Sequence, residues 1–242
     1  MWLGVSLLDF GRDSADLNRG NCYFGGKSAD EIGRLMSLYD KIFRKPAPIR
    51  DLAALADFID QQAAFLVQKG IYEYSRARAG HYAKVLFREQ TFLEAVEQSR
   101  WRAYPLGLAM IGELVEGVLR PHALDEPQRS ANSLAVIVLS VFDRYPLPTG
   151  LEEGMWRGAR NELALRLDRI GLHPAKPAMD IPEPLAKTYF DLMPIHKSLR
   201  GSDFPTIKSY LRVTLCNIHD ELTQRMDAEA VSDLLRRHTG QP

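Results

Sequence analysis

Apolar residues recur every three or four positions from residue 51 almost to the end of the chain, and prolines separate the periodic stretches. This spacing places the apolar side chains on one face of an α-helix. The first stripe consists of Leu52, Leu55, Ala56, Ile59, Ala63 and Leu66. Asp51 precedes it as a plausible N-cap, because its carboxylate can accept from the free N–H groups of the first turn. Gly70 or Gly80 is expected to end this helix.

The same spacing predicts a series of further helices, which cover residues 82–96, 101–119, 127–144, 151–170, 184–199, a stretch from 205, and 228–238. In the helix from 82, Val85, Leu86 and Phe92 are expected to point inward. Pro105 is expected in the first turn of the helix over 101–119, where a missing N–H is tolerated. Together these stretches predict an all-α protein, an irregular bundle of about seven or eight helices with short, proline-rich connectors.

The apolar run from Leu134 to Phe142 is ambiguous by itself, because a buried strand can have the same composition. We interpret it as a helix, since the sequence offers no second strand with which it could pair.

The chain of 242 residues is long enough for one large domain or two small ones. Residues 1–48 are interpreted as a partly flexible N-terminal extension with a short amphipathic segment that begins near Met36. Residues 49–242 are expected to form a single helical domain, with a sub-boundary near 145–150, where Pro146 and Pro148 interrupt the periodicity. Residues 1–35 are Gly-rich and weakly periodic, and they are expected to add little to the core.

The composition excludes several classes of protein. The 31 basic and 31 acidic residues balance, whereas nucleic-acid binders usually carry a basic excess. Two cysteines, Cys22 and Cys216, cannot form a disulfide framework and fit a reducing compartment. No apolar run approaches the roughly 20 residues that a membrane-spanning helix needs. We therefore expect a cytoplasmic protein with no nucleic-acid partner and no membrane span.

Common catalytic motifs are absent or out of register. Gly25-Gly26-Lys27-Ser28 looks like the end of a phosphate-binding loop, but Gly20 is one position too early and no apolar strand leads into the loop. HExxH, CxxC and GxSxG do not occur. Glu113 and Glu116 lie one turn apart and could act as acid and base, although such pairs are more often solvated or salt-bridged. We expect no cofactor, and the balance leans against an enzyme.

One adjacent His-Asp pair, His219-Asp220, allows an alternative hypothesis. Helical phosphohydrolases of the HD type use a histidine, a His-Asp pair and a distant aspartate to hold divalent metals that activate water. His196 could supply the upstream ligand, and Asp227 or Asp233 the last one, although the spacing matches poorly. On a helix, neighbouring residues point about 100° apart, so His219 and Asp220 would need ligands from other helices.

Two basic stripes are the most informative polar feature. His81, Lys84 and Arg88 follow a helical spacing in the first stripe; the second consists of Lys208, Arg212 and His219. If the two helices face each other, the stripes would flank an apolar groove that suits a carboxylate or phosphate on an apolar body. Alternatively, these side chains lie along the edge of the core with their charges in water.

The leading hypothesis is therefore a non-enzymatic helical protein that binds a protein partner or an amphipathic anionic ligand through these stripes. The segment Trp101-Arg102-Ala103-Tyr104 supports a partner, because Trp, Tyr and Arg are enriched in interface anchors. The alternative is a metal-dependent phosphohydrolase that uses His196, His219 and Asp220.

Overall fold

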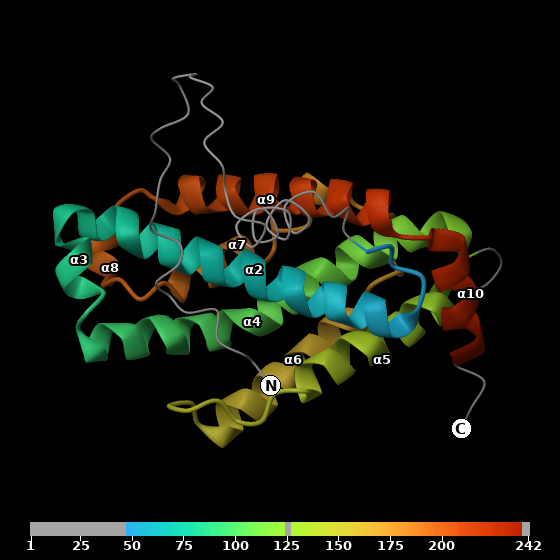
Figure 1. Cartoon of the computed structure of the whole chain (residues 1–242), viewed down its shortest axis with the longest axis horizontal. Coiled ribbons are helices and arrows are strands. Elements are labelled where there is room, and N and C mark those ends of the chain that lie inside the picture. Colours follow the sequence, from blue (N-terminus) through green and yellow to red (C-terminus); the bar gives the residue numbers. More distant parts are fainter. Residues whose placement is uncertain (1–46, 124–126, 239–242) are drawn as a thin grey trace, which may run out of the picture. The chain divides into compact units, whose positions relative to one another are not determined.

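A computed structural model describes residues 47–123 and 127–238 (Figure 1), and within these ranges the regular elements are helices, which confirms the all-α prediction. The long helices are α2 (Leu52–Ala79), α4 (Gln90–Leu119), α5 (Pro127–Asp143), α6 (Glu153–Leu167), α9 (Phe204–Arg225) and α10 (Ala228–His238). Short elements connect them: η1 (Gly80–Tyr82), α3 (Ala83–Leu86), η2 (Arg120–His122), η3 (Ala178–Asp180), α7 (Ala186–Asp191) and α8 (Lys197–Arg200). None of the described helices is long and apolar enough to cross a bilayer.

Helix α2 begins and ends where local chemistry predicts. The Asp51 carboxylate accepts a hydrogen bond of 2.8 Å from the N–H of Ala54, so Asp51 is the N-cap. Gly80 follows the last turn with a φ of +53°, a conformation that costs a residue with a Cβ about 1 kcal/mol or more. The helix runs through Gly70, so Gly80 is the glycine that ends it.

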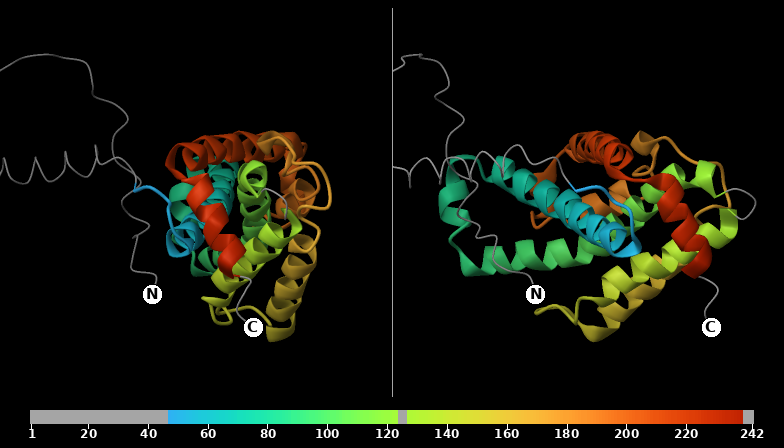
Figure 2. Two further views of the ribbon diagram at one scale, coloured as in Figure 1. Left: turned by 90° about the vertical axis from the view of Figure 1, so that its right-hand side faces the viewer. Right: turned by 45° about the vertical axis from the view of Figure 1, so that its right-hand side comes forward.

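Helix α4 is the central element of the bundle, because it packs against α2, α5, α6, α9 and α10. Figure 2 shows this helix surrounded by the others when the bundle is seen end-on. Gly107 allows the close approach of α2: a Cβ at this position would lie 2.9 Å from the carbonyl oxygen of Ala63 and 2.9 Å from Cγ1 of Val67. The residues of α4 from Ala103 to Gly112 are all buried, so this part of the helix is covered on every side.

The first part of α4 corrects the sequence analysis. One helix spans Gln90–Leu119, so Pro105 lies inside it and not in a first turn. Proline removes a single hydrogen bond, and the packing of the surrounding buried face offsets that loss. Residues 82–88 do not continue a long helix either; η1 and α3 form a tight connection, and the side chain of Val85 is 59% exposed instead of pointing inward.

Helix α5 includes the apolar run Leu134–Phe142, which confirms the helix interpretation. The chain then turns through Pro146 and Pro148 into α6, and the two helices are held together by aromatic packing. Phe142 stacks on Trp156 with their ring centroids 4.3 Å apart.

After α6 the chain continues through a proline-containing stretch, residues 171–185, which we call the connector. It begins at Gly171, four residues after the last residue of α6, and the φ of +92° at this position favours glycine. The connector packs along α9 through η3.

The turn between α7 and α8 is held by a buried arginine. The guanidinium of Arg200 donates hydrogen bonds to the carbonyls of Ile195 (2.7 Å), Phe190 (2.9 Å) and Met193 (2.7 Å). One side chain thereby binds three carbonyls of this turn, of which that of Phe190 also accepts from the N–H of Met193 at 3.2 Å.

The first described residues pair with the turn between α9 and α10. The N–H of Ile49 donates to the carbonyl of Arg225 (2.9 Å), and the N–H of Asp227 donates to the carbonyl of Ile49 (3.0 Å). Asp227 also caps α10 by accepting from the N–H of Ala230 at 3.2 Å.

Several expectations concern residues outside the described ranges. These are most of the extension over 1–48, its amphipathic segment near Met36, the partial phosphate-loop motif Gly25–Ser28, and Cys22. They stay predictions.

Candidate functional site

The first basic stripe does not lie on one helix. His81 belongs to η1, Lys84 to α3, and Arg88 to the turn that leads into α4. Their spacing of three and seven residues therefore does not produce a line along a helix face, because the backbone changes direction twice between α2 and α4.

The second stripe faces the connector. Lys208 forms an ion pair of 2.6 Å with Glu183, and Arg212 lies 3.7 Å from Asp180 and 3.9 Å from Glu183. The stripe thus holds the connector against α9 instead of facing the first stripe across a groove. Half-exposed pairs of this kind contribute about 0–1 kcal/mol each.

His219, the third member of the stripe, lines a pocket of about 370 Å³ between α4, the connector and α9. Cys216 and Asp220 lie on the same wall, and Gly117 of α4 leaves space on the other. At its edge, Lys176 forms an ion pair of 2.7 Å with Glu113, and Nδ1 of His219 lies 3.5 Å from a carboxylate oxygen of Asp220.

The residues proposed as metal ligands are not brought together. His196 is the N-cap of α8, where its Nδ1 lies 2.7 Å from Oγ of Ser198 and accepts from the Ser198 N–H. In the ranges that the structure describes, no three His, Cys, Asp or Glu side chains are close enough to hold a metal ion. Among residues 47–123 and 127–238, His219 and Asp220 therefore have no further side chains beside them that would complete a metal site.

Glu113 and Glu116 are salt-bridged and do not form an acid-base pair. Arg120 donates to both carboxylate oxygens of the buried Glu116, at 2.8 and 2.7 Å, while Glu113 contacts Lys176. The hydrogen bond to Glu116 is the largest cause of the raised pKa of Arg120.

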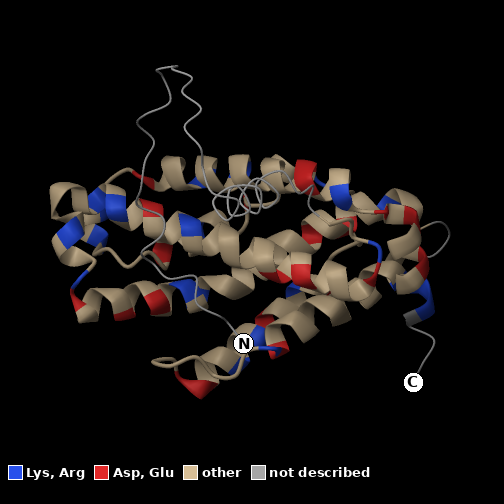
Figure 3. Ribbon diagram, viewed as in Figure 1, with Lys and Arg blue, Asp and Glu red and all other residues tan. Residues whose placement is uncertain are grey.

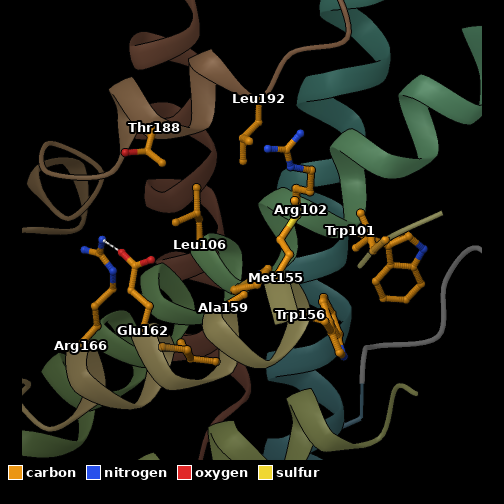
Figure 4. A pocket seen from close by; sticks show the side chains of 13 residues that line it. Trp101, Arg102, Leu106, Met155, Trp156, Ala159, Glu162, Arg166, Thr188 and Leu192 are labelled. Atoms are coloured by element: carbon orange, nitrogen blue, oxygen red, sulfur yellow. Dashed lines mark hydrogen bonds and ion pairs between the residues drawn. The ribbon is translucent and has the colours of Figure 1, made fainter. Parts of the chain in front are cut away.

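The strongest candidate site is an apolar groove between α4, α6 and α7, here called the α4–α6 groove (Figure 4). It has a volume of about 190 Å³. Its lining consists of Trp101, Arg102, Pro105, Leu106, Leu151, Met155, Trp156, Ala159, Glu162, Leu163, Arg166, Thr188 and Leu192.

Helical spacing places these side chains along the groove. On α6, Met155 and Ala159 are one turn apart, and Glu162 and Arg166 continue on the following turns. Leu106 follows Arg102 by one turn on α4. In Figure 4, Leu106 and Met155 lie between Arg102 on one side and Arg166 on the other.

The two arginines give the groove its charge. Arg102 is exposed, and no ion-pair partner for it occurs among the described residues. Arg166 donates through Nη2 to Glu162 at 2.5 Å, while its Nε is buried and has no hydrogen-bond partner in the described structure. Since Glu162 offsets one charge, the lining carries a net excess of one cation.

An aromatic cluster forms one end of the groove. The ring centroids of Trp101 and Trp156 are 6.0 Å apart in an edge-to-face arrangement, and Tyr145 packs against Trp101 at 5.2 Å. Tyr104 and Tyr145 both donate to Asp60 of α2, at 2.7 Å and 2.8 Å. Burial, and then the charge and hydrogen bond of Asp60, raise the pKa of Tyr104 far above its ordinary value.

Arg102 was expected to matter only as part of an anchor-like segment, and no sequence pattern pointed to Arg166. An available signal was the small and apolar series Met155, Ala159 and Leu163 on a helix whose other positions are mostly polar.

Comparison with protein families, with curated proteins and with solved structures gives no match to this chain.

Proposed function

We propose that this protein is a non-enzymatic recognition module that binds an acidic, amphipathic segment of a partner protein in the α4–α6 groove. The observation that carries the proposal is Arg102, an exposed guanidinium beside an apolar groove and without an ion-pair partner in the described residues. A carboxylate of the partner would accept from Arg102, while a neighbouring apolar side chain would fill the space between Leu106 and Met155.

The size of the groove favours side chains of a larger partner over a free small molecule. Its volume of 190 Å³ is below the range of about 300–1,000 Å³ that is typical of small-molecule pockets. Anchor side chains of a protein partner need only a local depression, and the remaining binding energy comes from the surrounding surface.

The residue types also support a protein partner. Trp101, Trp156 and Arg102 belong to the classes that dominate the energetics of protein interfaces. Met155, 42% exposed, adds a flexible and polarisable contact.

The test uses a displayed library of random peptides selected on the immobilised full chain. Selected peptides, once synthesised, are expected to contain a Leu, Met or aromatic residue next to Asp or Glu. Arg102→Glu should weaken their binding by on the order of tenfold to a hundredfold, because it replaces a charge-assisted contact by repulsion. Arg237→Glu is the matched control: Arg237 is exposed on α10, has no ion-pair partner in the described residues, and does not line the groove.

A second variant, Ala159→Phe, should block the groove without a change of charge and weaken the same peptides. Circular dichroism establishes that each variant is folded. The proposal fails if no peptide is selected, if the selected peptides lack acids, or if both groove variants bind as the unmodified chain does. Binding of octanoate with the same dependence on Arg102 would assign the groove to a small amphipathic anion instead.

The alternative of a metal-dependent phosphohydrolase has no comparable support. It needs His196 close to His219 and Asp220, whereas His196 caps α8 with Ser198 as its partner.

A further inference from the structure

The stretch of sequence that leads from the end of α2 toward α4 contains basic residues and no acidic ones. Residues 74–88 include Arg76, Arg78, Lys84 and Arg88 and no Asp or Glu. Figure 3 shows Lys and Arg gathered at this end of the bundle, where α2 passes into α3. We call residues 76–88 the tip.

Two apolar side chains project from the tip into solvent. Tyr82 is 73% exposed and Val85 is 59% exposed, so both side chains lie away from the core. They are three residues apart, Tyr82 at the end of η1 and Val85 in α3. Single exposed apolar residues are ordinary. Here, however, an aromatic and a β-branched residue are interleaved with His81, Lys84 and Arg88.

Most basic side chains of the tip have no ion-pair partner in the part of the chain that the structure describes. Arg78 contacts Asp203 at 3.2 Å, and that carboxylate also accepts from Tyr74 at 3.0 Å. Arg76, Lys84 and Arg88 have no ion-pair partner among the described residues. The acids that flank the tip in sequence are Glu73 on α2 and Glu89 at the start of α4, outside the stretch that bears Tyr82 and Val85.

We infer that the tip docks on an anionic lipid surface. In this arrangement Lys84 and Arg88 lie at the level of the headgroups, and Tyr82 and Val85 enter the interfacial region. Cations near an anionic bilayer are attracted to it electrostatically, and tyrosine is favoured at the boundary between headgroups and acyl chains. A membrane surface matches both features, whereas a nucleic acid would match the charge and leave Val85 without a favourable environment.

Sedimentation of the full chain with vesicles tests the inference. Binding is expected to vesicles of phosphatidylcholine that contain about 30% phosphatidylserine, and not to phosphatidylcholine alone. Lys84→Ala with Arg88→Ala should lower the partition coefficient about 25-fold, since each cation near the surface contributes about fivefold. Arg169→Ala with Arg237→Ala, which removes two exposed cations elsewhere, should lower it less than twofold.

A Tyr82→Trp variant reports insertion directly. The fluorescence that this tryptophan adds to that of the chain's own three tryptophans should be quenched by lipids brominated on their acyl chains, whereas the fluorescence added by Leu165→Trp, at an exposed position of α6, should not be quenched. Absence of vesicle binding, equal binding to neutral vesicles, or an unchanged partition of the Lys84/Arg88 double variant would overturn the inference. Binding of poly-glutamate or an oligonucleotide with the same dependence, without vesicle binding, would assign the tip to an acidic polymer instead. Because the groove residues are unchanged in all these variants, the outcome is independent of peptide binding in the α4–α6 groove.

Discussion

The hydroxyl of Tyr104 donates a hydrogen bond of 2.7 Å to Oδ1 of Asp60 and thereby joins α4 to α2. Trp101, which lines the α4–α6 groove, packs against the same tyrosine with ring centroids 5.8 Å apart. A partly buried polar contact therefore lies behind the groove, and it limits the freedom of the aromatic end to rearrange.

The buried tyrosines make the stability of the bundle sensitive to alkaline pH. Burial raises the pKa of Tyr74 to about 12, and burial with Asp60 raises that of Tyr104 further. A raised pKa in the folded state contributes stability below the unfolded-state value of about 10 that is lost as the pH rises through the folded pKa. Between about pH 10 and 12, each such tyrosine should lower the free energy of unfolding by about 1.4 kcal/mol per pH unit.

Urea unfolding at several pH values measures this slope. Tyr104→Phe should reduce the slope above pH ~10 by the contribution of one tyrosine. A slope that does not respond to Tyr104→Phe would show that this phenol does not stay protonated in the folded protein.

Gly70→Ala is predicted to destabilise the protein. A Cβ at this position of α2 would lie 2.6 Å from Cε1 of Tyr210 and would also collide with the hydroxyl of Tyr189. The two tyrosines donate to the carbonyls of Leu66 and Val67 on α2, so neither can move without loss of a hydrogen bond. We expect a loss of about 2–3 kcal/mol in unfolding free energy.

Gly158→Ala is the matched control for this glycine substitution. Gly158 also lies inside a helix, but a Cβ there would meet nothing within 4 Å. The higher helix propensity of alanine should stabilise the protein by about 0.5–1 kcal/mol. Equal effects of the two substitutions in denaturant unfolding would contradict the packing argument.

Arg200→Lys is predicted to loosen the segment between α7 and α9. A lysine keeps the charge but cannot direct donors to three carbonyls in one plane, as the guanidinium does toward Phe190, Met193 and Ile195. We expect a loss of about 2–3 kcal/mol. Amide hydrogen exchange should accelerate over residues 190–203 more than in α5; uniform acceleration would argue against a local role.

Two arginines, Arg102 within α4 and Arg120 at its C-cap, should differ in their effect on stability. Arg102→Ala removes a cation that has no ion-pair partner in the described residues, so the unfolding free energy should change by no more than about 0.5 kcal/mol. Arg120→Ala leaves the buried carboxylate of Glu116 unpaired and should cost about 3 kcal/mol. Chemical denaturation distinguishes them, and a large loss in Arg102→Ala would mean that this arginine is structural.

Much of the fold was predictable because it depends on local patterns. The Asp51 cap, the α5 helix around Leu134–Phe142 and the cap at Asp227 all follow from neighbouring residues. The prediction failed at Pro105 and at Val85, where distant packing decides the outcome. Pro105 stays within α4 because the buried face around it offsets one lost hydrogen bond, and no pattern within the segment reports that.

The candidate site was predictable only in character. A cationic rim beside an apolar surface was expected, and the proposed groove has one formed by other residues. Lys208 and Arg212, which were expected at the rim, are paired with Glu183 and Asp180 from a segment more than twenty residues away. Arg102 and Arg166 belong to different helices, and the groove between them exists only once α4 and α6 have packed. Spacing along one helix carries no information about such a pair.

The hydrogen bonds between Ile49 and the Arg225–Asp227 turn have a consequence for biosynthesis. A ribosome releases Ile49, which precedes α2, long before residue 227 exists, so Ile49 must wait until residues 225–227 emerge before it can form these backbone hydrogen bonds. These hydrogen bonds therefore form late in translation. Nascent chains arrested before residue 225 should expose the backbone around Ile49 to protease, and chains arrested well beyond residue 227 should protect it.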